Sequence, residues 1–196
     1  MLSLTENERK ALLILFKEFD SNYSANSLSK KLGISHVGAQ KLLKRLKAQG
    51  LTESKEIGKS IIHKINLEDD FSRKLISFLL AEEANNFKRW KDEFKELYKK
   101  GRIILIYGSA IKNYKAAEDI DIMAITKKDE SKEIDRKIIS MEDTLPKKIH
   151  CLKLTKTDLL RNARNKQEAI VDIIKNAIVL YGQDDYVEVL KDVTGF

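Results

Sequence analysis

The sequence contains a single cysteine, Cys151, and a single proline, Pro146, among 196 residues. One cysteine excludes an internal disulfide and a cysteine-based zinc cluster, and one proline argues against proline-rich linkers. No apolar run approaches the roughly 20 residues that a membrane-spanning helix needs. The N-terminal segment lacks the basic region and the apolar core of a signal peptide. We therefore expect a cytoplasmic protein without a membrane partner.

Acidic residues are scarce in the first third of the chain. Residues 1–67 carry 12 Lys and Arg against 6 Asp and Glu, whereas residues 68–196 carry 25 against 24. Nearly all of the formal net charge of +7 therefore lies in the first third. This asymmetry indicates either a polyanionic partner or a solvated basic surface, and charge alone leaves both open.

Periodicity and capping signals predict the local structure of this basic segment. We expect three helices and then two strands, at residues 5–19, 26–32, 35–49, 51–57 and 60–66. A tight turn at Gly33 separates the second helix from the third, and Gly58-Lys59 forms the turn of a hairpin.

Residues 28–51 resemble the helix-turn-helix of winged-helix transcription regulators, whose second helix enters the major groove of DNA. In that helix we expect an apolar stripe of Val37, Leu42, Leu43 and Leu46 to face the core. The resemblance implies base contacts near the start of the helix, and phosphate contacts by its basic residues and by the hairpin. The predicted residues for contacts with double-stranded DNA are Ser35, His36, Gln40, Lys41, Lys44, Arg45, Lys55 and Lys59. The alternative is a winged helix that binds another protein.

Residues 68–100 are predicted to form one long connecting helix, or two helices with a break. Phe87, Trp90, Phe94 and Tyr98 recur along it at helical spacing. We expect this aromatic face to form a homodimer, because winged-helix regulators bind paired half-sites as dimers. The alternative is that the aromatics pack the two flanking domains together.

The last third, residues 101–196, alternates strand and helix patterns. Strands are predicted at 102–107, 119–125 and 148–154. A helix is predicted at 131–143, one or two helices at 155–181, and a short helix at 184–192. The first strand ends in Gly108-Ser109, and the second opens with Asp119 and Asp121, which strand alternation places on one face. Two carboxylates on one face suit Mg²⁺ that accompanies a nucleoside triphosphate.

This pattern of Gly-Ser, a spacer and Asp-x-Asp resembles the minimal members of the DNA polymerase beta-like nucleotidyltransferase superfamily. The resemblance implies that Asp119 and Asp121 hold the metal and that Gly108 and Ser109 hold the triphosphate. Members of the superfamily usually have a third carboxylate on the next strand, and the residue that aligns with it is His150. An imidazole can accept a proton but is a poor Mg²⁺ ligand.

The sequence thus predicts an α+β protein with a winged helix-turn-helix at 1–67, a connecting helix at 68–100, and a nucleotidyltransferase-like α/β domain with a small mixed sheet at 101–196. Because the third carboxylate is missing, we favour a DNA-binding transcription regulator whose second domain binds nucleotide and Mg²⁺ but is catalytically impaired. The alternative is an active enzyme that transfers a nucleoside monophosphate from NTP·Mg²⁺ to a protein or small-molecule hydroxyl, with Asp119, Asp121 and His150 as its catalytic residues.

Overall fold

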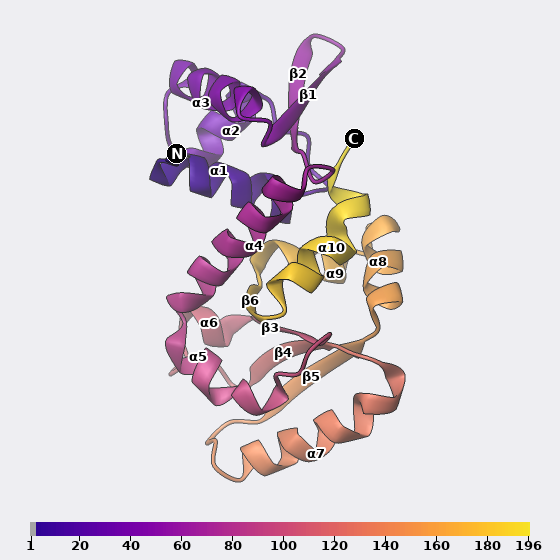
Figure 1. The fold of residues 1–196 in the computed structure, drawn as a ribbon. Helices are drawn as coiled ribbons and strands as arrows, with labels where there is room; N and C mark the ends of the chain where they lie inside the picture. Colours follow the sequence, from indigo (N-terminus) through magenta and orange to yellow (C-terminus); the bar gives the residue numbers. More distant parts are fainter. Residues whose placement is uncertain (1–2) are drawn as a thin grey trace. The chain divides into compact units, whose positions relative to one another are not determined.

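A computed structural model of the chain describes residues 3–196 (Figure 1). The chain separates into two compact units, Met1–Leu79 with Leu190–Phe196, and Leu80–Val189. The mixed α+β fold class predicted from the sequence is confirmed. The predicted three-part division at residues 67 and 100 stays a prediction. Within the described residues, every helix is too short or too polar to cross a lipid bilayer.

The first unit contains a winged helix-turn-helix. Its elements are α1 (Glu6–Lys17), α2 (Ala25–Leu32), α3 (His36–Ala48), β1 (Thr52–Ile57) and β2 (Ser60–Ile65). The two strands form an antiparallel hairpin, with Ile57 paired to Ser60 across the turn. Three helices and a hairpin are the elements that the sequence predicts for this segment.

Local capping signals explain where these helices begin and end. Thr5 accepts a hydrogen bond from the backbone of Glu8, whose carboxylate accepts one from the Thr5 amide, so the expected capping box is present. Gly33 ends α2 with φ of 67°, a left-handed conformation that favours glycine. Ser35 then caps α3, because its hydroxyl accepts a hydrogen bond from the Gly38 amide.

The buried face of α3 differs from the prediction at one position. Leu42, Leu43 and Leu46 are buried as expected, but the side chain of Val37 is 57% exposed. Ala39 takes the remaining core position, and the resulting spacing of 39, 42, 43 and 46 matches one helical face. Val37 was therefore wrongly assigned to the apolar stripe.

The segment predicted as a connecting helix is broken. It consists of α4 (Asp70–Asn85), α5 (Lys88–Glu93) and a 3-10 turn, η1 (Lys95–Leu97). Trp90 and Phe94 are buried in the core of the second unit, and Phe87 and Tyr98 pack against that core. The prediction that these four aromatics form an exposed dimer surface is therefore wrong. The homodimer itself stays a prediction.

A four-stranded mixed sheet forms the centre of the second unit. Its strands are β3 (Ile103–Tyr107), β4 (Ile120–Ile125), β5 (Ile149–Leu154) and β6 (Ile178–Tyr181), in the order β5-β4-β3-β6. β4 and β5 are parallel, whereas β3 runs antiparallel to both β4 and β6. β3 is almost entirely buried, as expected for a central strand.

Helices cover both faces of this sheet (Figure 1). One face packs its isoleucines against α5, η1 and α7 (Ser131–Glu142) in a continuous apolar core. The other face is covered by α8 (Lys156–Arg164) and α9 (Glu168–Asn176) (Figure 1). The short helix α6 (Ser109–Lys112), the 3-10 turn η2 (Lys128–Glu130) and α10 (Gln183–Thr194) complete the chain.

The prediction of one or two helices over residues 155–181 is wrong at its end. The run from Ile178 to Tyr181 forms β6, which pairs with β3. A short apolar run rich in branched residues and followed by glycine fits a buried strand better than a helix. Gly182 has φ of 82°, and a Cβ there would lie 2.4 Å from the carbonyl oxygen of Arg102. Glycine at 182 therefore lets β6 lie close to the start of β3.

Arg102 and two glutamates form a cluster of charged groups in the second unit. The side chain of Arg102 is fully buried and pairs with Glu130 and Glu133, each at 3.3 Å. Hydrogen bonds from Lys99 and Thr126 lower the pKa of Glu130 to about 2. Hydrogen bonds from Lys137 and Lys99 lower that of Glu133 to about 2.

Because both pKa values are depressed in the folded chain, these carboxylates stabilise the fold above the usual carboxyl pKa, 4.5. The stabilisation is lost as the pH falls from 4.5 towards 2. We expect thermal melts between pH 6 and 2 to show this loss, and the double variant Glu130→Gln/Glu133→Gln to be less stable at neutral pH but less sensitive to acid. An unchanged pH profile in the variant would contradict this assignment.

Candidate functional site

The exposed face of α3 and the hairpin form a basic surface. His36, Gln40, Lys41 and Lys44 are exposed on the helix, and Lys55 and Lys59 are exposed on the hairpin. None of these four lysines forms an ion pair with any residue that the structure describes. Their charges are therefore available to a ligand.

A cleft of about 530 Å³ lies between α3, the start of α2 and the hairpin. Its basic lining residues are His36, Lys44, Lys47, Lys59 and His63, and the lining includes no aspartate or glutamate. Such a cleft attracts anions, because no carboxylate offsets its positive charge. Lys47 and His63 are not among the residues predicted to contact DNA, although Lys47 follows Lys44 and Gln40 at helical spacing.

Two of the predicted DNA-binding residues also have structural roles within this unit. Arg45 forms a two-pronged ion pair with Glu8, whose side chain is almost fully buried on α1. Burial raises the pKa of Glu8, but hydrogen bonds from Arg45 and Thr5 outweigh it and hold that pKa below its usual value. Ser35 uses its hydroxyl as the cap of α3. Arg45 therefore ties α3 to α1, and its guanidinium is less available to phosphate than the lysines.

The second candidate site lies at the edge where β4 begins. Asp119 directly precedes β4 and Asp121 is its second residue, so their side chains share the face opposite Ile120 and Ile122. The parallel register places His150 of β5 directly beside Asp121. His150, which aligns in sequence with the third carboxylate of the superfamily, thus lies next to the aspartates in the folded sheet.

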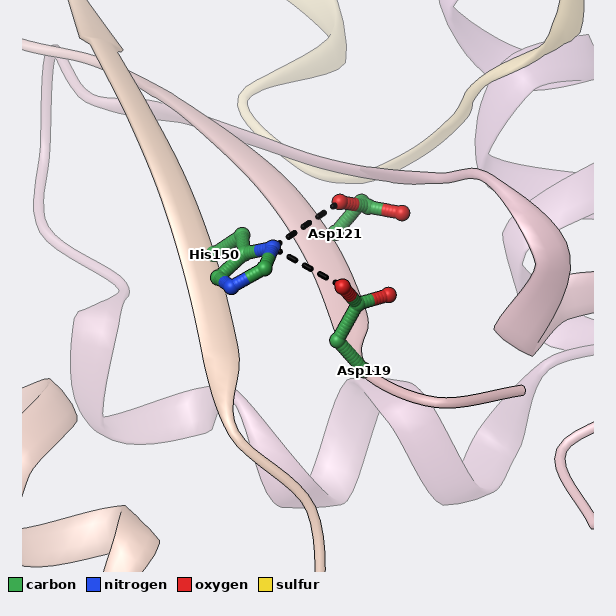
Figure 2. A group of neighbouring side chains, drawn as sticks. All are labelled: Asp119, Asp121 and His150. Carbon is green, nitrogen blue, oxygen red and sulfur yellow. Dashed lines mark ion pairs between the residues drawn. The ribbon is translucent and has the colours of Figure 1, made fainter.

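Figure 2 shows the imidazole of His150 pointing from its strand towards both carboxylates. His150 Nδ1 lies 2.9 Å from Asp119 Oδ2 and 3.9 Å from Asp121 Oδ1. One ligand atom from each residue falls within 4.8 Å of the others. The side chains are 62%, 31% and 25% exposed for His150, Asp119 and Asp121, so the cluster is open on one side.

Electrostatics at this cluster favour a positive ligand. Burial raises the pKa of Asp121, and the neighbouring Asp119 raises it further, while His150 acts in the opposite direction. Burial and the same aspartates also raise the pKa of Tyr107, the last residue of β3. A cation between the carboxylates would relieve the repulsion that these shifts reflect.

Gly108 and Ser109 lie beside the cluster at the end of β3. Both are exposed, and Ser109 begins the short helix α6. Gly108 has φ of 79° and ψ of −161°, a conformation that is essentially restricted to glycine. A Cβ at Gly108 would lie 2.3 Å from Asp121 Oδ2, so the absence of a side chain there leaves the space that this carboxylate occupies.

Two acids that lie near β5 in the sequence are used elsewhere. Asp158 caps the start of α8 through Thr155 and pairs with Arg161 at 2.8 Å. Glu142 accepts a hydrogen bond from the amide of Ile149. Among the described residues, the group of potential metal ligands at this edge consists of Asp119, Asp121 and His150. The two aspartates supply oxygen ligands that Mg²⁺ accepts, whereas the imidazole does not fit that ion.

Comparison with known proteins adds little to this geometry. No known protein family and no curated protein matches the sequence. Solved structures of substituted variants of Lactococcus lactis ZitR are similar at 15% to 16% identity, over 73% to 74% of this chain and 76% to 77% of theirs, with TM-scores of 0.34 to 0.35. Similarity at this level indicates neither a shared family nor a shared function.

Proposed function

We propose that the protein is a DNA-binding transcription regulator whose second unit binds a nucleotide with a divalent cation and is impaired in catalysis. The observation that carries the first part is the basic cleft between α3 and the hairpin, whose lining contains no acidic residue. In a winged helix this face is the one that meets DNA. An adjacent row of unpaired lysines is what phosphate contacts require.

The residues of this face have different roles in DNA binding. His36 and Gln40 lie towards the start of α3, where side chains reach base edges in the major groove. The side-chain amide of Gln40 can form two hydrogen bonds with a single adenine. Lys41, Lys44 and Lys59 neutralise phosphates, and this attraction is independent of sequence.

We expect duplex binding that weakens steeply with salt. In Lys41→Ala, Lys44→Ala or Lys59→Ala, the slope of log affinity against log salt concentration should become shallower by about one, because each variant releases about one fewer counterion. Fluorescence anisotropy with the full chain measures this. Lys115→Ala, an exposed lysine of the second unit, is the matched control and should keep the wild-type slope. Absence of duplex binding at low salt would refute the regulator proposal.

Val37 is expected to add a preference for thymine. Its exposed side chain lies one helical turn before Gln40, so both face the same groove. Replacing thymine by deoxyuridine removes one methyl group, worth about 0.8 kcal/mol or roughly fourfold in affinity if it is buried. The wild-type protein should therefore bind a duplex that was selected for tight binding less tightly once its thymines are replaced by deoxyuridine.

The variants separate a Val37 contact from a general effect of uracil on the duplex. Val37→Ala should bind the thymine and deoxyuridine duplexes about equally. Ile139→Ala, which shortens an exposed apolar side chain of the second unit, should retain the wild-type difference. Equal binding of both duplexes by the wild type would rule out a methyl contact.

For the second unit, the cluster of Asp119, Asp121 and His150 supports cation-assisted nucleotide binding. A phosphate-bound cation needs only one or two carboxylates from the protein. The backbone around Gly108 and the Ser109 hydroxyl are exposed beside the cluster and can donate hydrogen bonds to phosphate. Transfer asks for more, since a second cation and an anionic ligand normally assist loss of the acceptor proton.

A second candidate function is an active nucleotidyltransferase. The observation that favours it is the 2.9 Å pair of His150 Nδ1 with Asp119. A carboxylate that orients one imidazole nitrogen leaves the other free to accept a proton from an acceptor hydroxyl. In this candidate His150 acts as a general base in place of the missing carboxylate.

A further inference from the structure

The ligand set of the second site points to a particular class of cation. His150 Nδ1 lies 2.9 Å and 3.9 Å from the two aspartate oxygens (Figure 2). An ion bound tetrahedrally at about 2.0–2.2 Å from each ligand would separate the ligands by roughly 3.3–3.6 Å. The two distances from His150 lie on either side of this value, and the carboxylates lie within 4.8 Å of each other, so side-chain rotations would complete the site.

An ion that binds both aspartates also contacts the imidazole of His150. β4 and β5 are parallel, and their register pairs Asp121 with His150 along the backbone. Asp119 is on the same face, next to the same imidazole nitrogen. An ion that sits between the two carboxylates therefore meets His150 Nδ1 as its third ligand.

The chemistry of these three ligands differs from that of an all-oxygen site. Mg²⁺ prefers six oxygen ligands in an octahedron and releases its water reluctantly. Imidazole nitrogen is instead a good ligand for Zn²⁺ and its neighbours in the first transition row. Three protein ligands with one open position, as on the exposed side of this cluster, are typical of catalytic rather than structural Zn²⁺ sites.

We propose that Asp119, Asp121 and His150 form an open three-ligand site for a Zn²⁺-class transition-metal ion, in place of the Mg²⁺ that the two aspartates alone would suggest. The two carboxylates balance the charge of the divalent ion, and the imidazole nitrogen of His150 adds selectivity. The fourth position, on the exposed side of the cluster, accepts water or a phosphate oxygen. The inference rests on the cation site of the proposed function and specifies its ion.

The test is calorimetric titration of the full chain with Zn²⁺ alone and with Mg²⁺ alone. Wild-type protein should bind Zn²⁺ at least about tenfold more tightly than Mg²⁺. His150→Ala should weaken Zn²⁺ binding by about ten- to a hundredfold and leave Mg²⁺ binding within about twofold. His150→Asp should strengthen Mg²⁺ binding and reduce the ratio of the two affinities. His36→Ala, an exposed histidine of the first unit, is the matched control and should retain the wild-type ratio.

The outcomes separate this inference from the proposed function. Equal Zn²⁺ affinity in wild type and His150→Ala, with Mg²⁺-dependent nucleotide binding that Asp119→Asn removes, would overturn the inference and leave the nucleotide site standing. Zn²⁺ binding that persists in Asp119→Asn would place the ion elsewhere and overturn it too. Binding of neither ion, with or without nucleotide, would mean that His150 and Asp119 only pair with each other. That result would overturn both the inference and the proposed nucleotide site of the second unit.

Discussion

Gly108→Ala is expected to abolish cation binding at the cluster of Asp119, Asp121 and His150. A Cβ at this position would lie 2.3 Å from Asp121 Oδ2, so the carboxylate must rotate away from its place beside His150. The backbone conformation, with φ of 79°, is in addition strained for alanine and lowers the free energy of unfolding by about 1–3 kcal/mol. Calorimetric titration with Zn²⁺ and with Mg²⁺, alongside urea unfolding, measures both effects.

The matched control separates backbone strain from the loss of Asp121. Gly101→Ala also introduces a side chain at positive φ, 83°, in the same unit, but its Cβ would have no atom within 4 Å. We expect it to lower stability while leaving the affinity for the cation unchanged. Cation binding by Gly108→Ala at wild-type affinity would show that Asp121 is not a ligand.

Arg45→Ala is expected to destabilise the first unit, and thereby to weaken DNA binding indirectly. The substitution leaves the carboxylate of Glu8, which is only 1% exposed, without its cationic partner. Removing one member of a fully buried pair costs about 3–5 kcal/mol, and the half-exposed Arg45 side chain brings the value below that range. The loss should appear as faster hydrogen exchange of the amides in α1 and α3.

Three controls distinguish this structural role from phosphate contact. Lys41→Ala removes the same charge from the same helix without breaking the ion pair, so exchange should stay slow while DNA binding weakens. Arg45→Lys retains the charge beside Glu8 and should restore much of the protection. Trp90, the single tryptophan, lies in the second unit, so its fluorescence checks that this unit is unaffected. Unchanged amide hydrogen exchange in Arg45→Ala would show that Arg45 does not stabilise the first unit. Its role would then be the predicted contact with phosphate.

Local signals in the sequence were sufficient to predict most of the fold. The Thr5 capping box, the left-handed turn at Gly33 and the Ser35 cap are each formed by residues within a few positions of one another. They fix the start and the end of a helix almost independently of the rest of the chain. The predicted winged-helix order of elements follows from them.

The errors arise where tertiary packing decides between local alternatives. Val37 is apolar and close to the helical stripe, but Ala39 takes the core position and leaves Val37 exposed. The residues from Ile178 to Tyr181 have a helix before them, and only pairing with β3 makes them a strand. The sequence pattern also misses the ion pair of Arg45, because its partner, Glu8, is 37 residues away in the sequence.

The second site could be predicted in outline because its residues follow strand geometry. Alternation placed Asp119 and Asp121 on one face, and the resemblance to nucleotidyltransferases pointed to His150 on the next strand. The parallel register that brings His150 Nδ1 within 2.9 Å of Asp119 is a property of the folded sheet. The sequence therefore indicated which residues to consider, and the structure supplied the spacing that suggests a transition-metal ion.

The most direct test of a regulator with an impaired nucleotidyltransferase-like unit is pyrophosphate release during incubation of the full chain with labelled NTP and either Zn²⁺ or Mg²⁺. Wild-type protein should retain labelled nucleotide in an Asp119-dependent manner but release pyrophosphate far more slowly than the roughly 1–10³ turnovers per second of typical enzymes. His150→Asp should raise that rate with Mg²⁺. Wild-type release at ordinary enzymatic rates, abolished by Asp119→Ala, would contradict the account and establish the chain as an active nucleotidyltransferase.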